Sequence, residues 1–338
     1  MTKCLVSVDV ITYNHAKYIR QCLDGFVMQK TNFPFEVLIH DDASTDGTAD
    51  IIREYAEKYP DIIKPILQTE NQWSRGVSVD KVYNFPRIRG KYVAICEGDD
   101  YWTDPHKLQK QVDFLETHPD YSVCFHPVRV TWDDAHMPDY TFPTPRQCFN
   151  KTTLELSDLL KQNFIQTNSV MYRWRPECVD LFPTGILPGD WYLHLLHAQV
   201  GKIGFIPDVM AVYRRNAGGI WTGAFENDNW FVKNTMPCIA FYKCAAAQFN
   251  HDFSNSIVHV ASRGICAFLR TKQFDKIKQI CDLYPEYWNR ITQNINAMDA
   301  KKLRARASKY KKLFNTILII SILEFLTGIA LLTRVILS

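Results

Sequence analysis

Three acidic residues follow directly on an apolar stretch of this sequence. Tyr92–Cys96 is apolar, and Glu97, Asp99 and Asp100 come next, with Gly98 between the first two. Carboxylates this close repel one another, so a folded chain keeps them together where a cation offsets their charge. Carboxylate oxygens are the ligands that Mg²⁺ and Mn²⁺ prefer. The stretch predicts a site for one of these cations; the plainer alternative is a solvated acidic turn that caps the next helix.

Polar residues also follow two earlier stretches that read as buried strands. The first stretch spans residues 4–11 and the second spans 35–40, and they are followed by Tyr13, Asn14, Asp41 and Asp42. In open α/β sheets ligands bind at the carboxyl ends of the strands. We therefore expect these residues and the acidic triplet to lie along one edge of a sheet, although they are far apart in sequence.

The elements that must position these residues alternate between strands and helices. Further strands are expected in 62–69 and 92–96, and helices with a 3.6-residue apolar period in 15–29, 48–59 and 106–119. This alternation predicts an α/β fold with a mostly parallel central sheet flanked by helices. Beyond residue 125 we expect strands in 122–132, 164–173 and 204–214 and a short helix in 187–200; from residue 229 to 308 the chain reads as helical.

Composition excludes some classes of protein. The chain has 338 residues, 46% of them hydrophobic, and a net charge of +3, so nothing global indicates nucleic-acid binding. Its ten cysteines include no C-x-x-C pair, which favours reduced thiols in a cytosolic compartment. The N-terminal apolar run is too short for a secretory signal. We expect three parts: an α/β domain over 1–228, a helical region over 229–312 with a basic end, and an apolar helix over 313–338.

The C-terminal sequence suggests contact with a membrane. Residues 301–312 carry seven Lys or Arg residues, and the mostly apolar stretch 313–337 follows, interrupted by Glu324 and closed by Arg334. A membrane span, a helix lying in the membrane interface or in a self-associating pair, and a buried core helix are all compatible with this pattern. The first two would place the protein at the cytoplasmic face of the inner membrane.

Three stretches in order resemble a known enzyme family. They are "VITYNHAKYIRQCLDGFVMQ", "FEVLIHDDASTDGT" and "GKYVAICEGDDYWTDPHKLQKQ". Together they are similar to the family 2 glycosyltransferases, inverting enzymes of the GT-A fold, over roughly residues 4–220, and within that family to bacterial enzymes that build surface polysaccharides. The resemblance implies a nucleotide-sugar donor, usually a UDP-sugar, and a divalent metal, Mg²⁺ or Mn²⁺.

The resemblance also implies roles for individual residues. Tyr13 would stack on the base, Asp42 would accept a hydrogen bond from the uracil ring, and Asp99 and Asp100 would bind the metal. Glu97 replaces the first Asp of the family's D-x-D-D motif, which leaves its direct contact open. Core packing is the alternative for Tyr13, and a local turn is the alternative for one of the paired acids. The full nucleotide-binding set expected is Thr12, Tyr13, Asn14, Asp41, Asp42, Glu97 and Arg214.

The catalytic base of the family matches Asp190 in "PGDWYLHLLHAQ". Inversion by direct displacement needs a base that takes the proton of the acceptor hydroxyl. Trp191 would lie at the acceptor pocket, and Gly189 stands where the family usually has a Glu. A helix N-cap is the plainer role for Asp190. Asp133 and Asp134 are rival bases, although their Pro-flanked loop suggests a lid over the acceptor.

Residues 213–221 resemble the loop that closes over the donor in the family. Arg214 or Arg215 would contact the diphosphate through charge-assisted hydrogen bonds, and Asn216 takes the place of a family His. The expected function is transfer of a sugar from a UDP-sugar to a saccharide or a lipid-linked saccharide. Two alternatives stay open: a nucleotidyltransferase, which should carry a Gly-rich basic loop after the first strand, and a non-catalytic subunit that binds sugar nucleotides or glycans.

Overall fold

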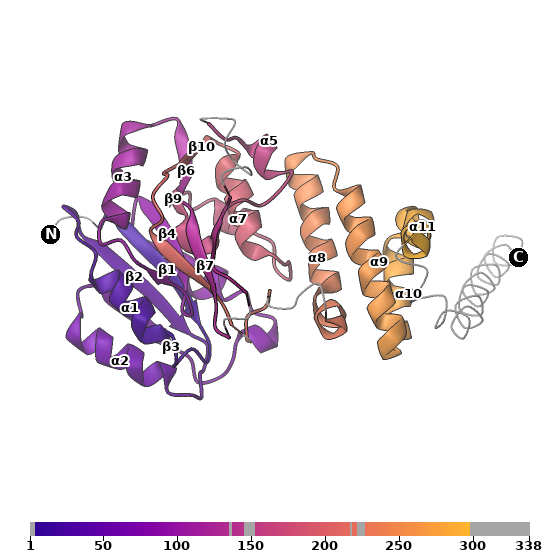
Figure 1. Cartoon of the computed structure of the whole chain (residues 1–338), viewed down its shortest axis with the longest axis horizontal. Helices are drawn as coiled ribbons and strands as arrows, with labels where there is room; N and C mark the ends of the chain where they lie inside the picture. Colours follow the sequence, from indigo (N-terminus) through magenta and orange to yellow (C-terminus); the bar gives the residue numbers. More distant parts are fainter. Residues whose placement is uncertain (1–3, 135–136, 145–152, 217, 222–226, 298–338) are drawn as a thin grey trace, which may run out of the picture. The chain divides into compact units, whose positions relative to one another are not determined.

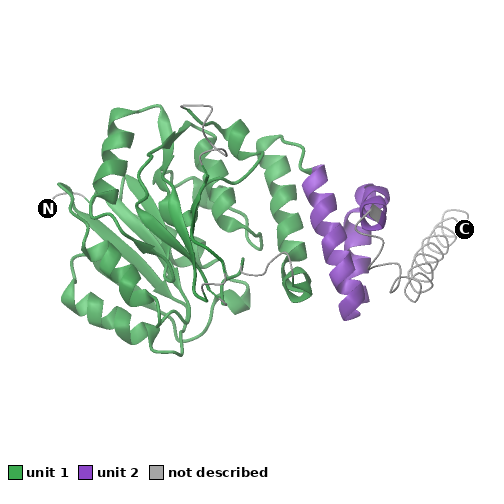
Figure 2. Ribbon diagram, in the orientation of Figure 1, with its two compact units in different colours: residues 1–253 green, residues 254–338 purple. Residues whose placement is uncertain are grey.

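The protein is described here by a computed structural model that covers residues 4–134, 137–144, 153–216, 218–221 and 227–297. The chain divides into two compact units, residues 1–253 and 254–338 (Figure 2). The first unit therefore extends beyond the boundary expected at residue 228, because helix α8 (Asp228–Phe249) belongs to it. Within the described residues, every helix is too short or too polar to cross a bilayer. The stretch 301–337 lies outside the described residues.

The first unit is built on a seven-stranded sheet with the order β10-β6-β9-β4-β1-β2-β3 (Figure 1). Its strands are β1 (Val6–Thr12), β2 (Phe35–Asp41), β3 (Ile63–Leu67), β4 (Tyr92–Glu97), β6 (Tyr121–Phe125), β9 (Met171–Arg173) and β10 (Lys202–Phe205). Strand β9 runs antiparallel between β4 and β6, and the other neighbouring pairs are parallel. The prediction of a mostly parallel α/β sheet is confirmed.

Helices cover both faces of this sheet. The helices of the first unit are α1 (Ile19–Val27), α2 (Thr48–Lys58), α3 (Lys107–Thr117), α5 (Leu156–Leu159), α6 (Cys178–Leu181), α7 (Gly189–Ala198) and α8. Side chains alternate along β4, so that Tyr92, Ala94 and Cys96 join a core with α1, α2 and α3. Val93 faces the other way and joins a core with α7 and α8. Figure 1 shows α1, α2 and α3 on one side of the sheet and α7 on the other.

A smaller sheet has the order β5-β11-β7-β8. It consists of β5 (Tyr101–Trp102), β7 (Val128–Trp132), β8 (Tyr140–Phe142) and β11 (Ala211–Arg215). Strand β5 follows the acidic triplet directly and pairs with β11, where Val212 lies opposite Tyr101. The small sheet therefore brings Arg214, which lies 114 positions after Asp100 in the chain, to the end of β4.

Three parallel strands end together at one edge of the large sheet. Thr12 at the end of β1 pairs in register with Asp41 at the end of β2, and Ile11 pairs with Glu97 at the end of β4. The register thus gathers the three polar strand ends that the sequence predicted to share an edge. This edge is where the candidate site lies.

The second unit is helical over the residues that the structure describes. Its helices are α9 (Ser254–Thr271), α10 (Phe274–Leu283) and α11 (Trp288–Ala297). Both α10 and α11 pack against α9, and Ile257, Ile265, Ile277 and Ile291 are buried there. The helical character expected after residue 229 is confirmed as far as residue 297.

Candidate functional site

The acidic triplet lies at the turn between β4 and β5. One carboxylate oxygen from each of Glu97, Asp99 and Asp100 lies within 4.8 Å of the others. This turn requires a glycine at position 98, because a Cβ atom there would lie only 2.5 Å from Oγ1 of Thr12. The backbone N–H of Gly98 also donates to the carbonyl of Ile11, at 2.9 Å. The ends of β1 and β4 therefore touch at a point where no side chain fits between them.

The electrostatics of the triplet suit a bound cation, since three carboxylates lie close together. Asp100 is fully buried, and burial together with the charge of Asp99 raises its pKa well above the usual range. Its Oδ1 accepts the N–H of Arg214 at 2.8 Å, whereas its buried Oδ2 has no hydrogen-bond partner. A divalent cation fits this oxygen-only group, because it prefers carboxylate ligands and would satisfy the unpaired oxygen.

Glu97 connects the triplet with Asp190. Glu97 is exposed at the end of β4, and desolvation together with the charges of Asp99 and Asp190 raises its pKa to about 8. Asp190 is half-buried in the first turn of α7. Asp99 and Asp190, the two acids expected to have different tasks, therefore both lie close enough to Glu97 for their charges to act on it.

Asp99 is surrounded by donors that come from other elements. The side-chain amide of Asn216 donates to its Oδ2 at 2.7 Å, and Nε2 of His15 lies 3.9 Å from the same oxygen. Arg214 donates to the Asp99 carbonyl at 2.7 Å, and its guanidinium lies over the rings of Tyr18 and Tyr101. Arg214 is thus at the triplet, as the sequence predicts, but it is held there by the backbone and by two aromatic rings.

The nucleotide-side residues lie on the loops that follow β1 and β2. Tyr13 is 45% exposed, so its ring is free to stack. Asn14 has a φ of 55° and ties the two loops together, since its Oδ1 accepts the N–H of Thr45 at 2.8 Å and its N–H donates to Oγ of Ser44. Thr12 is buried, and its hydroxyl has no hydrogen-bond partner. These placements are compatible with the expected nucleotide contacts.

The paired acids after β2 have different partners. Asp41 accepts the N–H of Ser44 at 3.1 Å and the Ser44 hydroxyl at 2.5 Å, which is the local turn expected for one of the pair. Asp42 accepts the backbone N–H groups of Gln72 and Trp73, at 2.7 and 3.0 Å. Asp42 therefore holds the short turn η1 (Trp73–Arg75) in place. Each carboxylate oxygen of Asp42 keeps a second lone pair for a further hydrogen bond.

Two placements on the acceptor side differ from expectation. Trp191 was expected at the acceptor pocket, but it is only 9% exposed, its indole N–H donates to the Leu159 carbonyl, and its ring packs on Phe241. Its ring is part of the core because α8 covers this face of α7. Asp133, the rival base, accepts hydrogen bonds from Lys17 and Tyr18 instead of standing open to an acceptor.

Sequence reasoning missed three contacts at the site, made by His15, Thr167 and Asn216. His15 directly follows Tyr13 and Asn14, so its place after a strand end was a usable signal. Asn216 was treated as a departure from a family pattern, yet it bonds Asp99. Thr167 donates to Oδ2 of Asp190 at 2.8 Å, and nothing in its local sequence indicates this contact.

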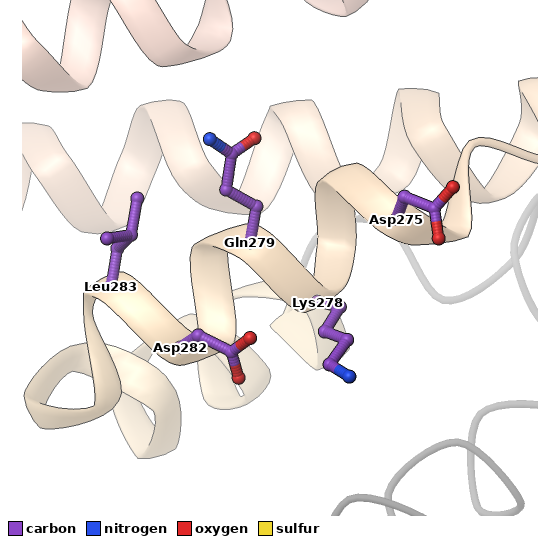
Figure 3. A pocket seen from close by; sticks show the side chains of 5 residues that line it. All are labelled: Asp275, Lys278, Gln279, Asp282 and Leu283. Atoms are coloured by element: carbon purple, nitrogen blue, oxygen red, sulfur yellow. The ribbon is translucent and has the colours of Figure 1, made fainter.

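A surface hollow of about 320 Å³ lies elsewhere, in the second unit. Its lining residues are Asp275, Lys278, Gln279, Asp282 and Leu283. All five are on α10, and Figure 3 shows their side chains fanning out along one helix. The hollow therefore brings together no groups from different elements, and it offers no arrangement for chemistry comparable to the acidic triplet.

Sequence comparison identifies relatives of the first unit. The family model described as glycosyl transferase family 2 matches residues 7–217. An uncharacterized protein of Mycobacterium tuberculosis (strain ATCC 25618 / H37Rv) is 49% identical over 226 residues, which are 67% of this chain and 63% of that protein. The alignment therefore spans less than two thirds of the relative's own length.

Comparison with solved structures identifies the fold. The Staphylococcus aureus protein TarS, residues 1–349 in complex with UDP-GlcNAc, has a TM-score of 0.51 and 18% identity, covering 78% of this chain and 81% of that one. The mannosyltransferase PcManGT from Pyrobaculum calidifontis, in complex with GDP-Man and Mn²⁺, has a TM-score of 0.53 and 19% identity, covering 87% and 84%. The architecture is the GT-A fold. With a family match over more than half of its length, the chain belongs to glycosyl transferase family 2.

Proposed function

We propose that this chain is an inverting glycosyltransferase that moves one sugar from a UDP-sugar to a saccharide or a lipid-linked saccharide. The observation that carries the proposal is that Asp99 and Asp190 both lie close enough to Glu97 for their charges to raise its pKa. A displacement at a sugar diphosphate requires a carboxylate that binds a cation and, close to it, a base.

The donor side of the proposal has two kinds of support. The exposed ring of Tyr13 and the lone pairs of Asp42 suit a pyrimidine base, and Arg214 suits a diphosphate. The solved relatives TarS and PcManGT were captured with UDP-GlcNAc and with GDP-Man and Mn²⁺. We propose UDP as the nucleotide and Mg²⁺ or Mn²⁺ as the cation, held by Asp99 and Asp100.

The reaction assigns one task to each group. An acceptor hydroxyl gives its proton to Asp190 while its oxygen bonds to the anomeric carbon, and the bond from that carbon to the diphosphate breaks, so that UDP leaves. Attack from the side opposite the diphosphate inverts the anomeric centre. A divalent cation, when bound, offsets the negative charge that develops on the departing diphosphate. Arg214 would hold the diphosphate in line with the attacking oxygen.

We also propose a place in the cell. The basic stretch 301–312 and the apolar stretch that follows suit an enzyme at the cytoplasmic face of the inner membrane, where a lipid-linked acceptor would meet a cytosolic donor. Such an enzyme would serve the synthesis of cell-surface polysaccharide. The support for this part of the proposal is the sequence alone.

The experiment that tests the proposed function is a donor panel. The full chain is incubated with Mn²⁺, one of several UDP-sugars or GDP-mannose, and saccharide or lipid-linked acceptors, and free nucleotide and product are measured by mass spectrometry. We expect UDP release with one UDP-sugar and an inverted anomeric centre in the product by proton NMR. Asp190→Asn should abolish transfer while Mn²⁺-dependent UDP binding remains, and Asp99→Asn should weaken that binding.

A matched control and three outcomes make the test decisive. Asp275→Asn on α10 removes an acid remote from the triplet in sequence and should leave transfer unchanged. Full transfer by both Asp99→Asn and Asp190→Asn would show that these residues do not form the site. Mn²⁺-dependent UDP binding without turnover of any donor would favour a non-catalytic binding subunit, and turnover of GDP-mannose alone would replace UDP in the proposal.

A further inference from the structure

Thr167 makes the side-chain hydrogen bond that orients Asp190. Its hydroxyl donates to Oδ2 of Asp190 at 2.8 Å, and the other oxygen, Oδ1, accepts the backbone N–H of Trp191 at 2.8 Å. Thr167 is only 6% exposed, so water competes little for this bond. An aspartate in the first turn of a helix can rotate about its side-chain torsions, and a donor on each oxygen selects one orientation.

Thr167 is itself fixed by a buried polar turn, residues 166–169. Within the turn, the carbonyl of Gln166 accepts the N–H of Ser169 at 2.9 Å and the Ser169 hydroxyl at 2.6 Å. Thr167, Asn168 and Ser169 form the single 3-10 turn η4 and are all buried. Hydrogen bonds within and around a buried turn face little competition from water and restrict its motion. Thr167 therefore has little freedom to follow a moving Asp190.

Each outward bond of the polar turn goes to a different element. The side-chain amide of Asn168 donates to the Val212 carbonyl of β11 at 2.9 Å. The backbone carbonyl of Asn168 accepts the indole N–H of Trp102 on β5 at 3.0 Å. The carbonyl of Ser169 accepts a bond from Gln111 on α3 at 2.9 Å.

These partners adjoin the diphosphate side of the site. Trp102 lies two residues after Asp100, and Val212 lies two residues before Arg214. The turn is therefore bonded on one side to the strands that carry the cation and diphosphate groups, and on the other to the candidate base.

We propose that Thr167 is a positioning residue for Asp190, and that the polar turn sets the distance between the base and the acidic triplet. This inference rests on the proposed function, in which Asp190 is the base. The charge of Asp190 acts on three further ionisable groups, Glu97 of β4, Tyr172 of β9 and His194 of α7. The hydroxyl of Tyr172 and Nδ1 of His194 bond each other, so neither atom serves Asp190.

Two variants test the inference. Thr167→Val removes the hydroxyl with little change of shape, and Thr167→Ser keeps the donor. We expect Thr167→Val to lower kcat about 10- to 100-fold, as loss of one hydrogen bond to a charged group implies, with KM for the donor unchanged. Thr167→Ser should recover most of the rate.

The control and the binding measurement separate this inference from the proposed function. Thr235→Val removes another buried hydroxyl of the first unit, one that donates to the Phe231 carbonyl of α8 at 2.6 Å. This variant should change neither kcat nor the KM for the donor. Binding of UDP with Mn²⁺, measured by calorimetry, should be the same in wild type and Thr167→Val. The inference is overturned if Thr167→Val turns over normally while Asp190→Asn is inactive, if it loses UDP binding, or if Thr167→Ser fails to recover. Normal turnover by Asp190→Asn would instead overturn the proposed function.

Discussion

Asp99 is the residue on which most of the site's contacts converge. Asn216 donates to its carboxylate, His15 approaches the same oxygen, and Arg214 donates to its carbonyl. These three residues come from the ends of β1 and β11, whereas Asp99 follows β4. A cation bound by Asp99 would therefore lie among groups from the ends of β1, β4 and β11.

Gly98 is the residue whose substitution should disturb this convergence most. A Cβ at Gly98 would lie 2.5 Å from Oγ1 and 2.6 Å from Cβ of Thr12, so one of the two strand ends must move. Overpacking of this kind typically costs about 1–3 kcal/mol. We expect Gly98→Ala to lower the melting temperature by several degrees and to weaken Mn²⁺-dependent UDP binding, measured by differential scanning fluorimetry and calorimetry.

The matched control for that prediction is Gly189→Ala. A Cβ at Gly189 would meet its nearest neighbour, Phe182, at 3.4 Å, an ordinary contact, and the residue begins α7. Alanine favours a helix over glycine, so this variant should be as stable as the parent or slightly more stable. Equal melting temperatures for Gly98→Ala and Gly189→Ala would show that the contact between Gly98 and Thr12 does not constrain the site.

At the scale of elements, the sequence predicts what periodicity and strand ends encode. The strands expected at 4–11, 35–40 and 92–96 lie within one or two residues of β1, β2 and β4, because short buried runs bounded by polar turns are a local signal. The register of parallel strands then places Thr12, Asp41 and Glu97 together. The clustering of these strand ends at one edge was therefore predictable from the sequence.

Other features depend on tertiary contacts that no local pattern carries. Of the strand expected over 164–173, only Met171–Arg173 forms β9, and Thr167–Ser169 instead forms the turn η4. Hydrogen bonds to Trp102, Gln111 and Val212 hold this turn. The bond between Asn216 and Asp99 joins residues 117 positions apart. The burial of Trp191 depends on α8, which starts 37 positions later in the chain. Periodicity says nothing about such pairs.

Helix α3 contains a charged residue in an unusual setting, which makes a pH-dependent prediction. Lys107 is fully buried, its Nζ donates to Gln111 at 2.7 Å and lies 4.0 Å from the centre of the Trp102 ring, and burial lowers its pKa to about 7. An unfolded lysine has a pKa of about 10.4. Between these two values the unfolded chain binds a proton that the folded chain lacks, so the free energy of unfolding should rise with pH, by at most about 1.4 kcal/mol per pH unit.

Urea unfolding at pH 7.5, 8.5 and 9.5 measures this contribution. Lys107→Met keeps the length of the side chain and should remove the positive slope, so that wild type gains stability relative to the variant as the pH rises. The buried thiols of Cys96 and Cys124 have raised pKa values and oppose the slope, but they are present in both chains and largely cancel in the difference. Lys58→Met, an exposed position on α2, should keep the slope of wild type. Parallel pH profiles for wild type and Lys107→Met would show that Lys107 stays charged in the fold.

At the scale of the whole molecule, every residue of the candidate site lies in the first unit, which leaves the second unit, residues 254–338, open to other tasks. Seven Lys or Arg residues lie between 301 and 312, and each adds about 1 kcal/mol of attraction near an anionic membrane surface. The apolar stretch 313–337 follows directly, and one apolar segment combined with a basic one suffices for stable attachment. A chain that ends at Ala297 keeps every described residue and loses both features.

Flotation with lipid vesicles distinguishes the contributions of these two stretches. We expect the full chain to bind vesicles that contain phosphatidylserine at least about tenfold more strongly than the chain ending at Ala297, because the attractions of the basic residues add. Both chains should bind UDP with Mn²⁺ equally, which controls for folding of the first unit. Binding that falls in 0.5 M NaCl would indicate a helix held in the interface mainly by charge, since salt screens exposed charges, whereas binding that resists both salt and carbonate would indicate insertion of the apolar stretch. Equal flotation of the two chains would show that the C-terminal sequence does not attach the protein to membranes. The acceptor would then be sought first among soluble saccharides.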